Sequence, residues 1–155
     1  EVAFEINQDI LPVTLNDKNI EIKNYINRAY ACLELIDDRN ASYINLDALT
    51  LIADNAWSAG VILGNQIKNW ENLDLNQLNS KLYWNNELIG ESKLLNTDPL
   101  NSLGWVIRHL CKYNKKIDKG SIIITGSLLK TKKPKSGDVI KFQIENLSSV
   151  ITEIN

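Results

Sequence analysis

The chain has 155 residues, a formal net charge of −2 and a hydrophobic fraction of 44%. This length fits one domain of ordinary size, and the composition is that of a globular protein rather than of a disordered or fibrous chain. The charge gives no basic footprint for nucleic acid, and no apolar run approaches the roughly 18 residues of a membrane helix.

The first third of the chain predicts a strand, a loop, a helix and a second strand. Residues 1–6 have the apolar character of a strand, and the polar segment 7–19 is expected to be a loop. Residues 19–30 place apolar side chains at helical spacing, which predicts a short amphipathic helix with Asn19 as its N-cap. The dense apolar run 29–37 predicts a buried strand.

The middle of the chain predicts a helix at 46–55, a short strand at 59–64 and a β-hairpin. The hairpin joins residues 78–84 to 87–90 through Asn85-Asn86, because asparagine tolerates the positive φ that such turns require.

The last third opens with the clearest helix signal. Asp98 is expected to cap this helix, Pro99 to occupy its first position, and the helix to end near Tyr113. Strands are predicted at residues 121–125, 139–144 and 150–154. The pattern predicts one α+β unit dominated by strands, without internal repeats or a linker.

Three sets of potentially functional side chains are expected to be solvated or structural. The lysine run Lys130, Lys132, Lys133 and Lys135 lies in a turn-like segment, so we interpret it as a solvated loop. His109, the single histidine, lies on the predicted 98–113 helix and is expected at the surface or in packing. The two cysteines lie far apart in apolar runs and indicate neither a zinc site nor a disulfide framework.

Glu34 is the most anomalous residue, because it lies between Leu33 and Leu35 in an apolar strand. If both faces of that strand are buried, its carboxylate needs a cation or several hydrogen bonds. The alternative is a half-exposed strand with Glu34 facing water. Glu1 heads another apolar strand, and two carboxylates on two strands suit a hard divalent ion such as Mg²⁺ or Mn²⁺, although Glu1 at a chain end could equally be solvated.

An ordered set of segments resembles the hydratase/decarboxylase branch of the fumarylacetoacetate hydrolase superfamily, which includes 2-oxopent-4-enoate hydratase and 4-oxalocrotonate decarboxylase. Residues 33–39 resemble its E-I-V-D-S-R motif, and residues 52–64 resemble V-A-D-N-A-S-S-G with a following V-L-G. Further segments follow in the family order: Asn86-Glu87 with Gly90, Asp98 to Trp105, Gly120 to Leu128, and Ser136-Gly137-Asp138. The set covers nearly the whole chain.

The resemblance implies a site. The family holds its divalent metal with an E-x-E pair and the glutamate of E-I-V-D-S-R, so Glu1 and Glu34 correspond to the second and third metal ligands. Ser58 matches the second serine of N-A-S-S, and Thr125 and Ser127 match a T-G-S turn that lines the active site. The first ligand and the family's acid/base lysine and aspartate are expected upstream of residue 1. The chain contains no methionine, so either its N-terminus has been removed, or it is a fragment, or modified methionines were left out of the sequence, and the sequence alone does not choose among these three.

Two residues depart from the family pattern. Trp57 replaces the first serine of N-A-S-S, where it could fill the space of the substrate or instead point into the core or a subunit interface. Asp38 replaces the serine of E-I-V-D-S-R and adds a negative charge near the proposed metal.

The resemblance therefore implies a single catalytic-type domain over residues 1–155, with the mixed β-sandwich or roll of the family's C-terminal part. It implies a metal-dependent lyase, a hydratase or decarboxylase, that acts on a small 2-oxo or 2-hydroxydienoic acid. The alternatives are a non-catalytic relative that serves as a binding or assembly module with Trp57 closing the pocket, and an acylpyruvate-type hydrolase. A homo-oligomer without nucleic acid or membrane partners is expected. No signal peptide is recognisable, so a cytoplasmic location is the default.

Overall fold

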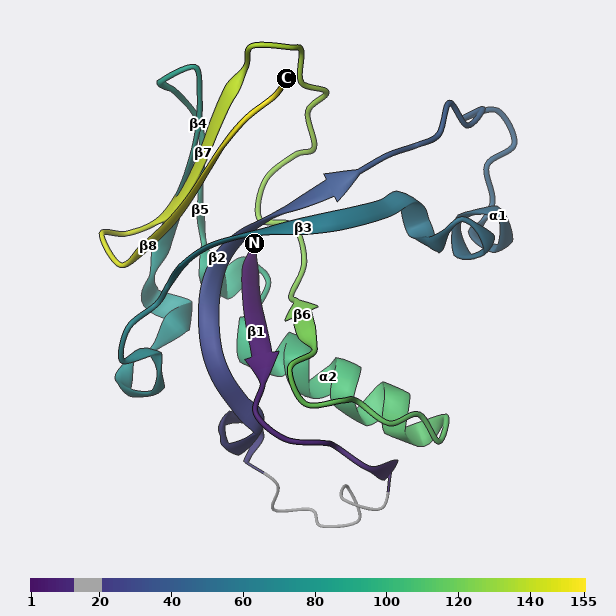
Figure 1. Cartoon of the computed structure of the whole chain (residues 1–155), viewed down its shortest axis with the longest axis vertical. Coiled ribbons are helices and arrows are strands. Elements are labelled where there is room, and N and C mark those ends of the chain that lie inside the picture. Colours follow the sequence, from purple (N-terminus) through teal and green to yellow (C-terminus); the bar gives the residue numbers. More distant parts are fainter. Residues whose placement is uncertain (13–20) are drawn as a thin grey trace.

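A computed structural model describes residues 1–12 and 21–155, which form two four-stranded antiparallel sheets and two α-helices (Figure 1). The first sheet has the spatial order β3 (Ser58–Gln66), β2 (Ile26–Ile36), β1 (Val2–Ile6) and β6 (Ile122–Ile124). The second has the order β5 (Glu87–Lys93), β4 (Asn79–Trp84), β7 (Val139–Ile144) and β8 (Ser148–Glu153). The helices are α1 (Ala48–Ala53) and α2 (Pro99–Lys112). The predicted α+β class is confirmed.

The centre of the core is β1, which lies between β2 and β6. Val2, Phe4 and Ile6 alternate along the strand and share one face, and all three are fully buried. Phe4 meets the buried Trp70 edge to face, with ring centroids 6.1 Å apart. The acidic side chains at this strand are Glu5, which is half-buried within β1, and Glu1, which immediately precedes it at the edge of the core.

The prediction of a helix at residues 19–30 is wrong. Residues 22–25 form a single 3-10 turn and β2 begins at Ile26, while Asn19 lies outside the described residues, as does the 13–19 part of the predicted loop. The register of β2 on β1 shifts between Glu5 and Ile6, so an extra residue bulges from β2. Because of this bulge, Ile26 and Ala29 are both buried although they are three residues apart, a spacing that imitates a helix.

The two sheets cross where β3 meets β8. A Cβ atom at Gly64 would collide with the backbone of Ser149, so glycine permits the close approach. Beside this crossing, the buried hydroxyl of Ser148 accepts the backbone N–H of Ala31 at 3.1 Å and donates to the carbonyl of Asn65. The second sheet contains the predicted hairpin, in which Asn85 and Asn86 both adopt positive φ, 51° and 68°.

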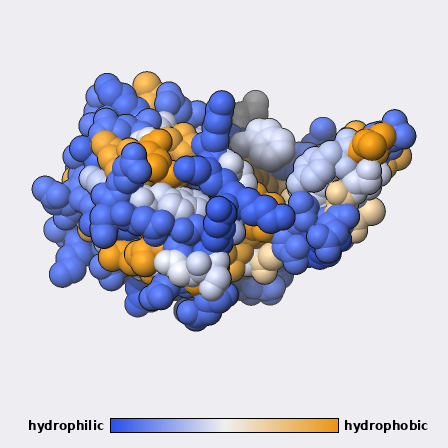
Figure 2. All heavy atoms as spheres, turned by 90° about the horizontal axis from the view of Figure 1, so that it is seen from above, coloured by the Kyte–Doolittle hydropathy of each residue, from blue (hydrophilic) through white to orange (hydrophobic). Residues whose placement is uncertain are grey.

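Beyond Cys32, β2 and β3 leave the body of the molecule as a two-stranded arm that ends in α1 (Figure 1). We use "arm" for residues 35–60. Asp47 caps α1 by accepting the backbone N–H of Thr50 at 2.7 Å. Figure 2 shows the arm standing clear of the body, with apolar residues gathered near its tip. The large apolar side chains exposed on the arm are Leu35, Ile36, Tyr43, Ile44, Leu49 and Ile52.

The helix α2 covers the opposite end of the first sheet (Figure 1) and buries Leu103 and Ile107. Pro99 occupies its first turn as predicted, but Asp98 does not cap the helix through its side chain. Asp98 has a φ of 41°, and its carboxylate instead accepts the side-chain amides of Asn76 and Asn101. No helix in the described part of the chain combines the length and apolar character needed to cross a membrane.

Candidate metal centre

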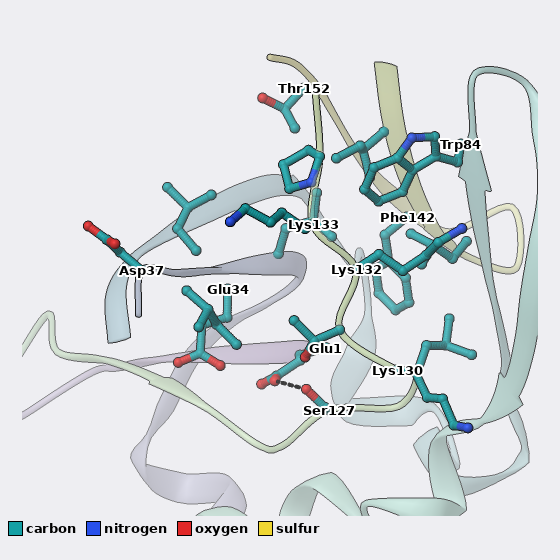
Figure 3. A pocket seen from close by; sticks show the side chains of 18 of the residues that line it. Glu1, Glu34, Asp37, Trp84, Ser127, Lys130, Lys132, Lys133, Phe142 and Thr152 are labelled. Atoms are coloured by element: carbon teal, nitrogen blue, oxygen red, sulfur yellow. Dashed lines mark hydrogen bonds between the residues drawn. The ribbon is translucent and has the colours of Figure 1, made fainter. Parts of the chain in front are cut away.

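The side chain of Glu1 is fixed at the start of β1 by the segment that follows β6. The main chain of Glu1 pairs with that of Cys32 through hydrogen bonds of 2.9 and 3.0 Å. The backbone N–H of Gly126 donates to Oε2 of Glu1 at 3.0 Å, and the hydroxyl of Ser127 donates to Oε1 at 3.1 Å (Figure 3). Each carboxylate oxygen therefore has one fixed donor, which orients the side chain.

The turn that supplies these donors is held against β1 by Thr125. Its backbone N–H and its hydroxyl both donate to the carbonyl of Val2, at 3.1 and 3.0 Å. Gly126 then adopts a φ of +105°, a conformation that glycine accepts without strain. The hydroxyl of Thr125 is thus engaged by the main chain, and Thr125 positions the turn rather than lining the pocket.

Glu34 lies beside Glu1 on the same face of the sheet. Cys32 is directly opposite Glu1, and Glu34 follows two residues later, so it points to the same side and is a diagonal neighbour of Glu1. Diagonal neighbours on antiparallel strands have their Cβ atoms roughly 7–8 Å apart or slightly less. Figure 3 shows the two carboxylates side by side, pointing in the same direction.

The pair suits a hard divalent cation. Glu34 is half-buried, and in the described part of the chain no hydrogen bond or ion pair reaches its carboxylate. Two neighbouring carboxylates repel each other, and a divalent cation between them removes this cost. Residues 1–12 and 21–155 contain no group of three His, Cys, Asp or Glu side chains arranged for an ion. Glu1 and Glu34 would thus be two of about six oxygen ligands, with water and substrate able to supply others.

Cys32 lies between the two glutamates on the same face but is unsuited to reaction. Burial raises the pKa of its thiol to about 12, with smaller contributions from the nearby charges of Glu1 and Glu34. A thiol of this kind stays protonated at neutral pH, and the thiolate is the form that binds metals or attacks substrates. Cys32 therefore contributes packing.

Glu1, Glu34 and Ser127 line a pocket of about 670 Å³ that lies between the arm, the second sheet and the segment 127–134. This volume falls within the roughly 300–1,000 Å³ of small-molecule sites. Its polar side is formed by the glutamates with Asp37 and Asp38. Its apolar side is formed mainly by Leu82, Trp84, Leu129, Ile140 and Phe142. The pocket thus offers charged and apolar surfaces to one ligand.

The lysine run was interpreted as a solvated loop from its sequence, yet three of its members line this pocket: Lys130, Lys132 and Lys133. All three are exposed at the rim, so they are both solvated and next to the site. Composition gave no sign of this, because only the path of the loop past the glutamates brings these lysines to the pocket.

Trp57 and Ser58 lie on the arm, away from the pocket lining. Trp57 packs edge to face on Tyr43, with ring centroids 5.3 Å apart, and its carbonyl accepts the backbone N–H of Asp37 at 2.9 Å. Ser58 is paired with Ile36 in the ladder of the arm. Trp57 touches the pocket only through Tyr43, which does line it. The two residues predicted to contact substrate therefore shape the arm.

Comparison with known proteins connects the chain to a set of enzymes. No model of a known protein family matches it. It is 29% identical over 140 residues to a 2-oxo-hept-4-ene-1,7-dioate hydratase of Escherichia coli. This match covers 84% of this chain and 51% of that protein. It is 27% identical over 155 residues to a 2-keto-4-pentenoate hydratase of Paraburkholderia xenovorans, covering 99% and 56%. A 4-oxalocrotonate decarboxylase of Pseudomonas sp. strain CF600 is 30% identical over 120 residues, covering 76% of this chain and 45% of that protein.

The chain is a homologue of these hydratases and decarboxylases. It spans about half the length of the curated relatives it matches.

Solved structures share the fold. A 4-oxalocrotonate decarboxylase from Pseudomonas putida G7, in complex with magnesium and adipate, superposes with a TM-score of 0.83 at 22% identity, covering 100% of this chain and 59% of that one. A maleylpyruvate hydrolase from Sphingobium sp. SYK-6 gives a TM-score of 0.65 at 16% identity, covering 99% and 53%. The resemblance to the hydratase/decarboxylase branch and the fold of the fumarylacetoacetate hydrolase type are thereby confirmed.

Proposed function

We propose that this hydratase/decarboxylase homologue is a divalent-metal-dependent lyase that acts on a small 2-oxo or 2-hydroxydienoic acid, with Glu1 and Glu34 as ligands of Mg²⁺ or Mn²⁺. The single observation that carries the proposal is the carboxylate pair of Glu1 and Glu34 at the wall of a ligand-sized pocket. The names of the relatives support the reaction class, and the magnesium in the related decarboxylase structure supports the kind of ion.

The residues of the chain have distinct tasks in this proposal. Glu34 and Glu1 hold the ion, and the Gly126 and Ser127 donors keep the Glu1 carboxylate in one orientation. When bound, a divalent ion supplies Lewis-acid stabilisation of the negative charge that develops on the 2-oxo oxygen. The apolar wall beside Trp84 and Phe142 accepts the hydrocarbon part of the acid and keeps water from it.

The competing interpretations differ in what they require of Trp57. A non-catalytic relative in which Trp57 closes the pocket requires that side chain inside the cavity. Trp57 packs on Tyr43 outside the lining residues, which supports an accessible pocket and hence the enzyme. The relatives matched in sequence are named as hydratases and decarboxylases, which supports a lyase over a hydrolase.

The test is turnover of 2-hydroxypenta-2,4-dienoate by the natural protein, followed by loss of its ultraviolet absorbance, with and without a chelator. We expect activity that chelation abolishes and that Mg²⁺ or Mn²⁺ restores. Glu34→Gln should lower the affinity for Mn²⁺, measured by titration calorimetry, by at least tenfold, because it removes a charged ligand.

The matched control is Glu87→Gln, which removes a carboxylate from an exposed position at the start of β5, away from the pocket. It should leave Mn²⁺ affinity within twofold of the natural protein. Equal Mn²⁺ affinity in Glu34→Gln and Glu87→Gln would remove Glu34 from the ligand set. Absence of turnover with normal metal binding would instead favour a non-catalytic relative.

We also propose that the protein is a homo-oligomer, as the resemblance implies. The exposed apolar residues of the arm support this proposal, because isolated soluble monomers rarely expose contiguous apolar patches. Sedimentation velocity of the natural protein and of the double variant Leu49→Ser/Ile52→Ser tests it. Monomers in both samples would contradict the proposal.

A further inference from the structure

Among the three lysines that line the pocket, only Lys133 is directed towards the carboxylate side. Figure 3 shows its ammonium group pointing from the 127–134 segment towards Asp37, on the side of the pocket where Glu34 also lies. The ammonium group of Lys132 instead lies over the ring of Trp84, 5.1 Å from its centroid. Lys130 points away from Glu1 in the same view. Lys133 is therefore the one that can meet a ligand held at the metal centre.

The ammonium group of Lys133 forms no hydrogen bond or ion pair with any residue in the part of the chain that the structure describes. Its charge nevertheless acts on Asp38 of the arm. The pKa of Asp38 is lowered chiefly by the hydroxyl of Tyr43, then by the backbone N–H of Asn40 and also by Lys133. Lys133 thus faces an acidic wall without being neutralised by any single partner in it.

That acidic wall creates a problem for an anionic ligand. Asp37 and Asp38 line the same pocket as the glutamates, and they repel a carboxylate that extends past the metal centre. The apolar wall beside Leu82 and Phe142 would also leave such a carboxylate without a partner, which is costly. A cation on the acidic side of the pocket removes this penalty, and the ammonium group of Lys133 lies there.

We propose that Lys133 determines specificity by binding a second carboxylate of the substrate, so that the pocket prefers 2-oxo dicarboxylic acids to 2-oxo monocarboxylic acids. This inference rests on the proposed function, because the first carboxylate and the 2-oxo group must be held by the divalent ion that Glu1 and Glu34 bind. The substrate then spans the pocket, with its hydrocarbon chain along the apolar wall and its far end at Lys133.

The experiment compares the affinity of the natural protein, with Mg²⁺ present, for 2-oxoadipate and 2-oxohexanoate. These saturated acids have equal chain lengths and differ by a terminal carboxylate. Titration calorimetry should show tighter binding of 2-oxoadipate. Lys133→Gln, which removes the charge but keeps a polar side chain that is one atom shorter, should reduce that preference about tenfold, the usual effect of losing a charged hydrogen bond. Lys133→Arg should largely restore it.

Lys135→Gln is the control, because Lys135 lies in the same loop but outside the pocket lining. It should leave the preference within twofold, which separates a local contact from a general loss of positive charge. If both acids bind in a metal-dependent manner and Lys133→Gln leaves their ratio unchanged, this inference is overturned while the proposed function stands. If neither acid binds the natural protein with Mg²⁺, the proposed function itself falls.

Discussion

The two halves of the β2–β3 ribbon carry similar side chains in different surroundings. In the body, Ala29, Ala31 and Cys32 of β2 are completely buried, because β1 lies on one side and β3 on the other. In the arm, Leu35 and Ile36 of the same strand are 42% and 43% exposed. β1 pairs with β2 as far as Cys32, whereas Leu35 and Ile36 are paired with Gly60 and Ser58 of β3. The comparison shows that the burial of a side chain on β2 depends on the strands beside it and not on the hydrophobicity of β2 itself.

The candidate metal centre lies where these halves meet. Glu1 is held in the body by Cys32 of β2 and by the turn that follows β6, whereas Glu34 lies on β2 next to the arm. The candidate site thus combines the Glu1 carboxylate, which two donors orient, with the Glu34 carboxylate, which no hydrogen bond orients in the described residues, and both line the pocket beside the arm. Variants in the body and on the arm should therefore differ in their effect on the free energy of unfolding.

The largest effect is expected in the body. Phe4→Ala removes a fully buried ring that contacts Trp70, and it should lower the free energy of unfolding by about 3–5 kcal/mol. Ile52→Ala on the arm truncates a side chain that is 72% exposed and should change stability by no more than about 0.5 kcal/mol. Urea denaturation followed by tryptophan fluorescence measures both. Comparable losses would show that the arm is as well packed as the body.

A smaller effect is expected where the ribbon crosses the second sheet. Gly64→Ala places a methyl group against the backbone of Ser149, and it should cost about 1–3 kcal/mol. Gly60→Ala in the same strand meets only Leu35, at 3.8 Å, and should be neutral or slightly stabilising. Neither glycine has a positive φ, so the two variants differ in packing alone. Similar unfolding free energies for both would contradict the close contact between β3 and β8.

The smallest effect concerns two tyrosine–carboxylate hydrogen bonds. In the body, Tyr30 donates to Glu5 at 2.7 Å, and this bond, with that from Asn27, lowers the pKa of Glu5 below 4.5. A lowered carboxyl pKa contributes stability above the unfolded pKa and loses it as the pH falls through the folded one. Tyr30→Phe should therefore destabilise the protein above about pH 4.5, and the difference should vanish at lower pH.

On the arm, Tyr43 donates to Asp38 at 2.7 Å, and this bond likewise lowers the pKa of Asp38. Tyr43 is exposed to solvent, whereas Tyr30 is half-buried, so Tyr43→Phe should leave the global pH dependence of unfolding unchanged. Unfolding free energies of both variants between pH 3 and pH 7 give the comparison. A pH-dependent loss in Tyr43→Phe equal to that in Tyr30→Phe would show that the arm unfolds together with the body.

Much of the fold follows from local patterns. The hairpin at Asn85-Asn86 and the helix that begins at Pro99 were predictable, because turn residues and proline act on their own backbone. The helix predicted at 19–30 failed, because a bulge opposite Glu5 and Ile6 creates helical spacing inside a strand. Such a bulge depends on the partner strand, so the sequence of the bulged strand does not reveal it.

The candidate site divides in a similar way. Glu34 was conspicuous in the sequence because a charge among leucines needs a partner, and Glu1 followed as a carboxylate on a second strand. The rim lysines were missed, and Trp57 and Ser58 lie on the arm rather than in the pocket. These placements depend on where a long loop and a protruding ribbon run in space.

The sequence by itself determined the α+β class, most of the strands and the presence of an anomalous carboxylate, since alternation, turn residues and the cost of burying charge are properties of short segments. Only the tertiary structure decided that Glu1 lies diagonally opposite Glu34, that Gly126 and Ser127 hold Glu1, and that Lys133 faces the pocket. Those facts depend on strand register and loop path, which are set by packing between residues far apart in the chain.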